Sequence, residues 1–284
     1  MTRFTLGASA GMKIAWAFLL AGSVAAAQES AAPIGAQEPG VADLDLEDLM
    51  KVRVTSVARK EQTLTGVPAA VYVIRGEDIK RTGARSLPEA LRGVPGIHVA
   101  RTNAHTWAVS SRGFNSSSAN KMLVMIDGRS VYSPLHSGVF WDVQDTLLQD
   151  IDRIEVIRGP GGTIWGSNAI NGIINVITKK ASETRGGAVM AGVGTEEKDF
   201  AGARYGLKIG EEADVRVYAK YFNRDDAVGG LDDDAKARDD WFQSRAGFRS
   251  DWKSGERDQF TVMGDFYEGE MQHQSTIPSI TTPF

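Results

Sequence analysis

The chain has 284 residues, of which 42% are hydrophobic and 24% are charged, and its formal net charge is −4. This length and composition predict one or two folded domains with buried cores and exclude a disordered chain. The acidic balance argues against a nucleic-acid partner. Because the sequence contains no cysteine, disulfides, thiolate catalysis and cysteine-ligated metal sites are also excluded.

The first 27 residues have the features of a cleaved export signal. Arg3 and Lys13 supply positive charge, an apolar run follows from Ile14 to Val24, and residues 25–27 (AAA) offer a small-residue cleavage site. A membrane-spanning helix is the alternative, but it needs about 20 apolar residues, and this run is shorter. Loss of the signal leaves 30 of the 32 basic residues against 36 acidic ones. We therefore expect an exported, acidic mature protein.

No later segment is apolar over the length of a spanning helix, so a membrane-embedded mature protein would cross the bilayer with β-strands. Residues 28–42 are rich in Ala, Gly, Pro and Gln, which predicts a flexible leader. Asp43 to Met50 is predicted to form a short helix, because acidic residues occupy its first turn. An extended, β-branched stretch follows from Val52 to Val57, and such a peptide can add itself as a strand to the sheet edge of another protein.

Short strands and short helices alternate at close spacing from residue 70 to residue 180, which predicts a compact α+β domain over 66–182. Ser86 to Glu89 has the pattern of a capping box with proline near the helix start, and Gly93 is expected to stop that helix. Several of the expected strands end at glycine-containing turns such as Asp127-Gly128. Their ranges are Ala70–Ile74, Ile97–Arg101, Trp107–Arg112, Met122–Ile126 and Ile154–Ile157.

From residue 186 onward the pattern changes to alternation of apolar and polar residues over segments of about ten residues, which is typical of the wall of a membrane β-barrel. In Ala213–Asn223, for example, Val215 and Val217 alternate with Arg216 and Lys220. We expect the apolar face to contact lipid and the polar face to contact water. A soluble β-sandwich also alternates, but its strands are usually shorter. The five expected strands are Gly187–Gly194, Ala201–Ile209, Ala213–Asn223, Phe242–Trp252 and Gln259–Glu268.

Six motifs occur in an order that resembles the plug domain of TonB-dependent outer-membrane receptors. The resemblance is close over residues 45–180, and the later strands are similar in style only. It implies an α+β plug domain followed by antiparallel transmembrane β-barrel strands, in the outer membrane of the cell. The motifs are Leu87–Ile97 (LPEALRGVPGI), Ser111–Phe114 (SRGF), Val124–Arg129 (VMIDGR), Ile154–Pro160 (IEVIRGP), Trp165–Ala169 (WGSNA) and Asn171–Ile177 (NGIINVI).

The resemblance implies energised uptake of a scarce ligand, such as an iron-siderophore or a cobalamin-like metal complex. A short segment near the mature N-terminus, the TonB box, would bind TonB, which uses its inner-membrane energising complex to pull on the plug. The matching segment lies within residues 43–65, and its β-branched sequence without proline suits strand addition. The alternative is that it forms the first strand of the plug. The box residues would be Val52, Arg53, Val54, Thr55, Ser56, Val57 and Ala58.

Two further sets of residues follow from the same resemblance. Arg112, Glu155 and Arg158 stand where the family has charges that pair the plug with the barrel interior, although they could also form ordinary surface ion pairs. Ligand contacts are expected at the plug apex, in loops that hold aromatic and histidine side chains. Aromatic residues in a loop often pack that loop instead. The apex residues proposed are His105, Trp107, Tyr132, His136 and Trp141.

No motif indicates an enzyme, a cofactor or a metal site. Arg158–Gly162 (RGPGG) lacks the Gly-Lys-Ser/Thr of a phosphate loop, and the four histidines lack metal-ligand spacing. The acidic stretch from Asp225 to Asp240 could attract a cation, but a solvated loop is the simpler interpretation. Two alternative functions remain open: a signalling or surface-binding receptor, and an exported plug-like binding domain without transport. The leader is too short for the extra domain that signalling receptors carry.

Five strands are too few to close a barrel. Transporters of the family that the chain resembles have about 22 strands, and open strand edges are not tolerated in lipid. We therefore expect the sequence to be a truncated or partial chain that cannot transport as written. A small oligomer that shares strands between chains is a less favoured alternative, because nothing in the segments specifies a partner.

Overall fold

The computed structural model describes residues 53–55, 62–227, 237–255 and 258–272, all within one compact unit. The expected export signal, leader and first helix, and the segment 228–236 of the acidic loop, lie outside the described residues. Among the helices of the described residues, none is long and apolar enough to span a membrane. The described chain begins with β1 (Arg53–Val54), which pairs antiparallel with β2 (Gln62–Thr63), and η2 (Leu64–Gly66) follows directly.

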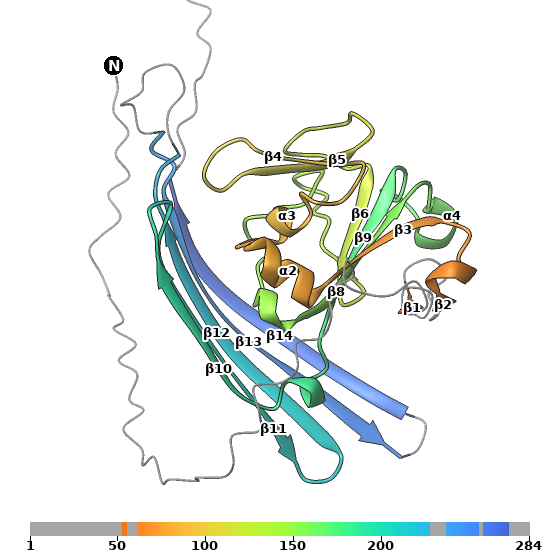
Figure 1. Cartoon of the computed structure of the whole chain (residues 1–284), viewed down its shortest axis with the longest axis vertical. Helices are drawn as coiled ribbons and strands as arrows, with labels where there is room; N and C mark the ends of the chain where they lie inside the picture. The colour runs from red at the N-terminus through yellow and green to blue at the C-terminus, as the bar shows by residue number, and fades with distance from the viewer. Residues whose placement is uncertain (1–52, 56–61, 228–236, 256–257, 273–284) are drawn as a thin grey trace, which may run out of the picture. The chain divides into compact units, whose positions relative to one another are not determined.

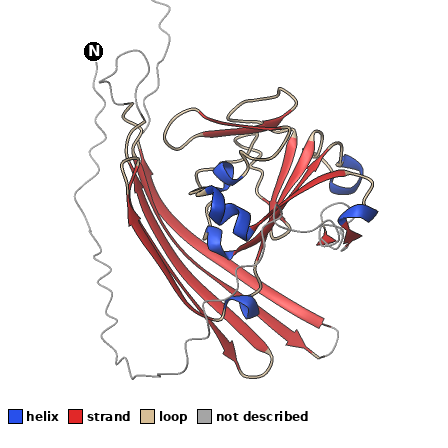
Figure 2. Cartoon of the chain, in the orientation of Figure 1, coloured by secondary structure: helices blue, strands red, loops and turns tan. Residues whose placement is uncertain are grey.

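The plug is built on a five-stranded mixed sheet in the order β3-β8-β9-β6-β7. Only β6 and β9 run parallel, and the other neighbours are antiparallel. The β-branched runs of β8 and β9 favour extended structure and are buried in the middle of the sheet. The strands, shown in red in Figure 2, are β3 (Ala70–Arg75), β8 (Ile151–Arg158), β9 (Gly172–Thr178), β6 (Met122–Ile126) and β7 (Arg129–Ser130).

One face of this sheet carries the main hydrophobic core. Helices α2 (Gly76–Thr82) and α3 (Leu87–Ala90) and the hairpin of β4 (Ile97–Arg101) and β5 (Trp107–Ser111) supply the covering side chains. Short elements connect the rest of the plug: η3 (Leu148–Asp150), α4 (Gly162–Trp165) and η4 (Ala181–Thr184). The residues that make this core include Ile74, Ile79, Leu87, Leu91, Trp107, Trp141, Ile154, Val156 and Ile174.

The start of α3 differs in detail from the expected capping box. The helix begins after Ser86 with Pro88 in its first turn, as predicted, but the Ser86 side chain makes no capping hydrogen bond. The Glu89 carboxylate instead accepts a hydrogen bond of 2.7 Å from the backbone N–H of Arg85. The helix ends at Ala90, before Gly93.

The second part of the structure is a five-stranded antiparallel sheet, which we call the wall. Its strands follow one another in chain order, and Figure 1 shows them side by side as one curved sheet. The connection from β11 to β12 is short and the one from β12 to β13 is long. The strands are β10 (Gly186–Val193), β11 (Glu197–Ile209), β12 (Ala213–Arg224), β13 (Trp241–Ser254) and β14 (Asp258–Met271).

The two faces of the wall have opposite chemistry, as the alternation predicted. Large apolar side chains such as Tyr205, Val217 and Phe266 are exposed on one face. On the other face Arg216 and Arg249 are buried, so the polar face packs against the plug rather than facing open water. The expected fold class, an α+β plug domain followed by antiparallel strands of an incomplete barrel, is confirmed.

Candidate functional site

The face of the wall that the plug covers is held by buried ion pairs, and Asp150 lies at the centre of this contact. Asp150 ends η3 and is 2% exposed. Its Oδ1 accepts a hydrogen bond of 2.9 Å from Nη1 of Arg204 on β11, and Nε of Arg216 on β12 lies 3.4 Å from its Oδ2. Two guanidinium groups of the wall therefore share one carboxylate of the plug, which makes that carboxylate difficult to remove.

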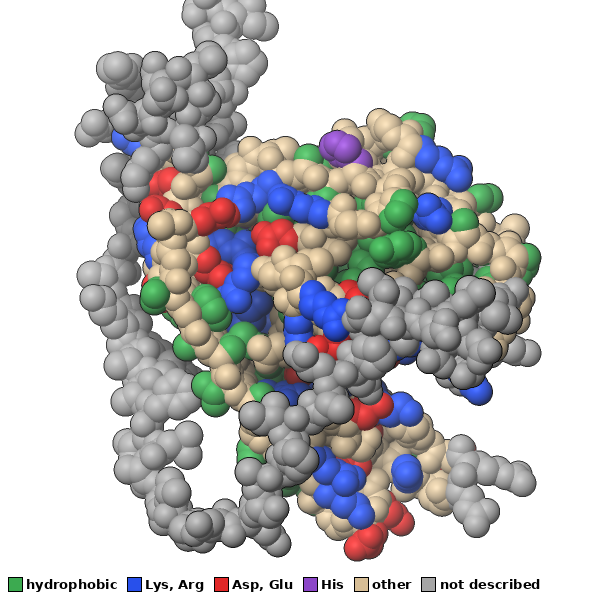
Figure 3. Space-filling view, in the orientation of Figure 1, with side chains coloured by type: hydrophobic (Ala, Val, Ile, Leu, Met, Phe, Trp, Pro, Cys, Tyr) green, Lys and Arg blue, Asp and Glu red, His purple; other side chains and the backbone are tan. Residues whose placement is uncertain are grey.

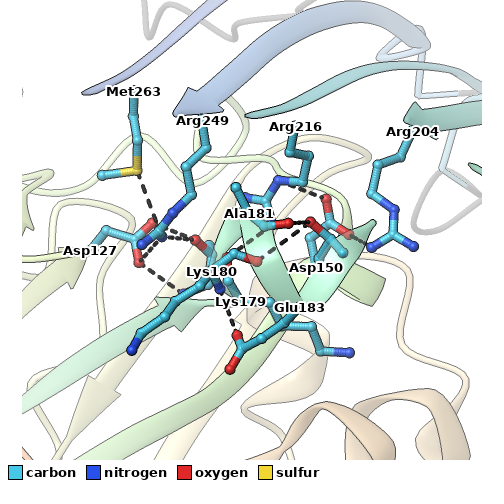
Figure 4. A network of polar contacts seen from close by, with 12 residues as sticks. Asp127, Asp150, Lys179, Lys180, Ala181, Glu183, Arg204, Arg216, Arg249 and Met263 are labelled. Atoms are coloured by element: carbon cyan, nitrogen blue, oxygen red, sulfur yellow. Dashed lines mark hydrogen bonds and ion pairs between the residues drawn. The ribbon is translucent and has the colours of Figure 1, made fainter. Parts of the chain in front are cut away.

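A second group of contacts fixes the passage from the plug to the wall (Figure 4). Arg249 on β13 donates hydrogen bonds to Asp251 and to Oγ1 of Thr178, and its Nη1 lies 3.8 Å from Asp127. Asp127 accepts two further hydrogen bonds of 2.8 Å from Thr178. The Asp251 carboxylate also accepts a 2.7 Å hydrogen bond from the backbone N–H of Ala181. Charge-assisted hydrogen bonds of this kind anchor the end of β9 and the start of η4 to the wall.

A third group of contacts joins segment 142–146 of the plug to β12 and β13 of the wall. Nζ of Lys220 lies 2.7 Å from the Asp145 carboxylate. Arg245 donates to the carbonyl oxygen of Val143, and Nε2 of Gln243 donates to that of Asp142 at 3.2 Å. The backbone of this segment thus finds hydrogen-bond partners in wall side chains, as a buried loop requires.

Near the β10–β11 turn the plug supplies the basic side chains and the wall supplies the acidic ones, which is the reverse of the contacts described above. Arg85 of the plug pairs with Glu197 at 2.7 Å and stacks over the ring of Phe200, with 3.5 Å from its guanidinium carbon to the ring centroid. Arg101 pairs with Glu196 of the turn itself. Figure 3 shows Lys and Arg side chains gathered beside Asp and Glu side chains on this part of the surface. This reversal restricts the position of the plug along the wall, because sliding the plug relative to the wall strands would bring like charges together.

The tip of the β4–β5 hairpin is fastened to the wall as well. Asp239 accepts a 2.6 Å hydrogen bond from the backbone N–H of Ala104, and Nε1 of Trp241 donates to the Ala104 carbonyl oxygen at 3.1 Å. Nε2 of His105 lies 3.3 Å from the carbonyl oxygen of Gln272. Ala104, Trp241 and Phe222 form a small apolar cluster around these bonds. His105, proposed above as a ligand contact, is buried in this arrangement.

The other residues proposed as ligand contacts lie in two different environments. Trp107 and Trp141 are buried in the plug core, so they pack the fold, which was the alternative for aromatic loop residues. Tyr132 and His136 are half-buried on a loop that backbone hydrogen bonds between Ser133 and Gly138 close into a compact turn.

This turn presents an apolar surface to solvent. The ring of His136 stacks on Phe140 with 4.0 Å between the ring centroids, and Leu135 is 96% exposed. Among the five proposed residues, only Tyr132 and His136 therefore retain surface that a ligand could contact. Ligand binding by them stays a prediction.

A cavity of about 190 Å³ separates α2 of the plug from the wall strands β10 to β12. Leu147, Met190 and Phe200 form apolar parts of its lining, and Lys80, Arg85 and Lys220 add basic groups. Each of these bases is paired with a carboxylate. Within the described part of the chain, no group of three or more His, Asp or Glu side chains is arranged to hold a metal ion.

The expected TonB box is described only over Arg53, Val54 and Thr55, and its other residues, Val52, Ser56, Val57 and Ala58, lie outside the described residues. Val54 is buried against Val73 of the plug sheet. The backbone N–H of Thr55 donates to both carboxylate oxygens of Glu155, at 3.0 and 3.2 Å. This pairing agrees with the alternative stated above, a first strand of the plug, and it does not test the binding of TonB.

The three residues expected to pair the plug with the barrel interior have other contacts here. Glu155 contacts Thr55 and Arg153, and Nη1 of Arg158 donates to the carbonyl oxygen of Pro95 at 3.3 Å. Arg112 is exposed, in a left-handed conformation just after β5. Their pairing with further barrel strands stays a prediction. The plug acids that meet the described wall are Asp127, Asp145 and Asp150.

A family model described as the TonB-dependent receptor plug domain matches residues 63–173. The chain carries the plug domain of a TonB-dependent receptor. The resemblance found in the sequence is thereby confirmed, and the matched family is one of receptors and transporters rather than enzymes.

Curated relatives support the same assignment. The chain is 38% identical over 150 residues to the vitamin B12 transporter BtuB of Vibrio vulnificus, which covers 52% of this chain and 24% of the relative. It is 32% identical over 185 residues to an iron-regulated outer membrane virulence protein of Vibrio cholerae, which covers 61% of this chain and 28% of the relative. The chain thus spans about a quarter of the length of the curated relatives it matches.

Solved structures share the fold of the plug and the wall together. The pyoverdine outer membrane receptor FpvA of Pseudomonas aeruginosa matches with a TM-score of 0.62 at 19% identity, covering 76% of this chain and 30% of that one. The ferric yersiniabactin uptake receptor FyuA of Yersinia pestis matches with a TM-score of 0.57 at 17% identity, covering 71% and 32%. The five strands of the wall therefore correspond in fold to part of such a receptor.

Proposed function

We propose that this chain is the plug and the first wall strands of an outer-membrane receptor that imports a scarce ligand with energy supplied through TonB. The observation that carries the proposal is the buried contact of Asp150 with Arg204 and Arg216. It fastens a folded domain to the inner face of a sheet whose outer face is apolar. A domain held there blocks the lumen of a barrel, so passage of a ligand requires that the domain be moved.

The two faces of the wall support the outer membrane as the location. Exposed Phe, Tyr, Val and Trp side chains on the outer face suit lipid, and the bilayer requires that strands crossing it have their backbone groups paired. An exported chain with such strands fits the outer membrane, the location given in the names of the Vibrio cholerae virulence protein and of FpvA. The expected cleavage of the export signal is part of this proposal.

The ligand class follows from the relatives and from the loops of the plug. BtuB is a vitamin B12 transporter, and several structural relatives are siderophore receptors. Tyr132 and His136 present aromatic surface beside exposed Leu135, which suits a bulky metal chelate with apolar or aromatic parts. We therefore propose a ferric siderophore or a cobalamin-like complex as the ligand.

Uptake measured in living cells tests the proposal. The gene would be expressed, with any sequence that follows residue 284, in bacteria that lack their own cobalamin and siderophore receptors, with and without TonB. Radioactive cyanocobalamin and a panel of ⁵⁵Fe-loaded siderophores serve as probes. We expect at least one probe to accumulate only when TonB is present. Binding at the cell surface without accumulation would favour a surface-binding receptor, and accumulation without TonB would contradict the proposal.

A further inference from the structure

The carboxylate of Glu155 is the most deeply buried charge of the plug sheet. Glu155 lies in the middle of β8, opposite Val73 of β3 and Asn175 of β9, and it is 0% exposed. Its two oxygens accept hydrogen bonds of 3.0 and 3.2 Å from the backbone N–H of Thr55, and Oγ1 of Thr55 donates a third at 3.3 Å. One carboxylate thus holds a residue that lies 100 positions earlier in the chain.

A neighbouring arginine balances this buried charge. Nε of Arg153, two residues earlier on β8, donates to Oε1 of Glu155 at 2.9 Å, and Arg153 also pairs with Asp152. Burial alone would lower the pKa of the Arg153 guanidinium, but its interactions with Glu155 and Asp152 raise that pKa above its ordinary value. The guanidinium therefore stays charged and partly exposed to solvent beside the carboxylate.

The apolar part of the same contact is small. Of the described residues of the segment, only Val54 inserts into the plug, where it is 1% exposed and packs with Val73. Strand β1 has two residues, and its partner β2 belongs to the same N-terminal region. Little buried apolar surface would therefore be exposed if segment 53–55 left the plug, so the hydrogen bonds to Glu155 contribute to holding it there.

We propose that Glu155 is a latch that holds segment 53–55 on the plug and sets how readily this segment is released. Its purpose, control of access to the TonB-binding segment, rests on the proposed function. A carboxylate suits a reversible latch, because water can take the place of the Thr55 N–H and hydroxyl groups when the segment leaves. A purely apolar contact would instead expose hydrocarbon on opening and would resist release.

Amide hydrogen exchange on the folded protein, read by mass spectrometry, tests the latch directly, because the Thr55 amide is protected only while it is bonded. The wild-type protein, Glu155→Ala and Glu155→Gln would be compared. Asp152→Ala is the matched control, since Asp152 contacts the same Arg153 but no residue of segment 53–55 in the contacts described. Peptides that cover β5 report on the plug core in every variant.

We expect exchange in the peptide containing Thr55 to rise about tenfold or more in Glu155→Ala, which corresponds to about 1.4 kcal/mol, and to rise less in Glu155→Gln, which keeps one acceptor. Asp152→Ala and the β5 peptides should change by less than about threefold. Unchanged exchange at Thr55 in Glu155→Ala would overturn the latch. An equal rise in the β5 peptides would also overturn it, because Glu155 would then hold the whole plug.

Binding of the periplasmic domain of TonB to the same variants separates the latch from the proposed function. If Glu155 controls access to the TonB-binding segment, Glu155→Ala should bind this domain more tightly than wild type, while Asp152→Ala should not. Faster exchange at Thr55 with unchanged TonB binding would support Glu155 as the residue that holds the segment and contradict its control of access. Absence of TonB binding in every variant, wild type included, would instead contradict the proposed function.

Discussion

The carboxylate of Asp150 and the guanidinium of Arg204 meet at 2.9 Å across the boundary between plug and wall, 54 residues apart in the chain. Asp150 leads into the interior strand β8 of the plug sheet, and Arg204 lies in the middle of β11. The contact therefore joins the core of one sheet to the inner face of the other. Since Arg216 approaches the same carboxylate, the loss of Asp150 would leave the buried Arg216 and the half-buried Arg204 without this acidic partner.

Replacement of Asp150 by alanine is expected to destabilise the folded protein by about 3 to 5 kcal/mol, because it breaks a buried ion pair from one side. The midpoint of urea unfolding in detergent micelles measures the change. Asp152→Ala is the control, since the Asp152 side chain is 41% exposed and its pair should contribute less than about 1 kcal/mol. Equal losses of unfolding free energy in the two variants would show that burial does not strengthen the Asp150 contact.

Asp239→Asn should loosen the tip of the β4–β5 hairpin without unfolding the plug. The two carboxylate oxygens accept hydrogen bonds from the backbone N–H groups of Ala104 and Ala227. An asparagine has a single, uncharged acceptor oxygen, so one of these N–H groups would face its NH2 group and lose its acceptor. We expect amide exchange in a peptide covering residues 102–106 to rise about tenfold, from a loss of about 1 to 2 kcal/mol. Exchange within β9 should stay constant, and a uniform rise in both regions would refute a local role.

The stability of the plug should depend on pH through Asp142. Burial raises the pKa of the Asp142 carboxyl, although hydrogen bonds and the nearby His105 and His136 act in the opposite direction. The folded state then binds more protons than the unfolded state, so stability falls as pH rises from the ordinary pKa of 3.8 through the raised value. Asp142→Asn removes this penalty.

Asp142→Asn is therefore expected to be more stable than wild type at pH 7, with a difference that shrinks as the pH approaches 4. Free energies of unfolding from urea titrations at several pH values measure this dependence. A difference that stays constant over the whole range would mean that the substitution acts by packing and not by charge.

Gly206 is a position of close backbone approach. A Cβ atom there would lie 2.1 Å from the carbonyl oxygen of Thr184, where the chain enters the wall. Gly206→Ala should therefore destabilise the protein by about 1 to 3 kcal/mol. Gly187→Ala on the adjacent strand is a matched control, because its Cβ would meet only the Tyr205 ring at an ordinary 3.8 Å. Thermal unfolding of both variants distinguishes them, and equal melting temperatures would be inconsistent with the close contact.

Much of the fold could be predicted from local patterns. The apolar run Met122–Ile126 and the stretch Ile97–Arg101 have the strand boundaries that were expected, because short apolar runs and turn residues act over a few positions. The interior strand β8 extends to both sides of the expected Ile154–Ile157. Asp152 and Arg153 look polar enough for a loop, but they pair with each other and lie within the sheet.

The contacts between plug and wall could not be predicted in the same way. Asp127, Asp145 and Asp150 are single acids at the ends of strands or in loops, and nothing in their neighbours distinguishes them from solvated residues. Their partners stand in strands 54 to more than 100 residues later. The basic residues of the wall, in contrast, were visible as one alternating face, since Arg216 and Lys220 recur at even spacing.

The site residues taken from the resemblance show the same limit. A motif such as Ile154–Pro160 identifies where Glu155 stands in the chain, but only the folded sheet reveals that its carboxylate points to Thr55. Likewise, the sequence does not distinguish an aromatic loop residue that packs in the core from one that binds a ligand. The side chain of Trp107 is buried in the plug core, and the guanidinium groups of Arg92 and Arg101 lie over its ring.

The docking of the plug on the inner face of the wall can be tested most directly by cross-linking, because the chain has no cysteine of its own. Cysteines introduced together at Gln149 of the plug and Met190 of β10, whose side chains contact each other at 3.9 Å, would be treated with a short bifunctional maleimide in intact outer membranes. The pair of Gln149 with exposed Val189, the preceding residue on the opposite face, serves as the control. We predict efficient cross-linking of Gln149→Cys/Met190→Cys and little of Gln149→Cys/Val189→Cys. Equal cross-linking of the two pairs in folded protein, or none in either, would contradict a plug held by the inner face of the wall.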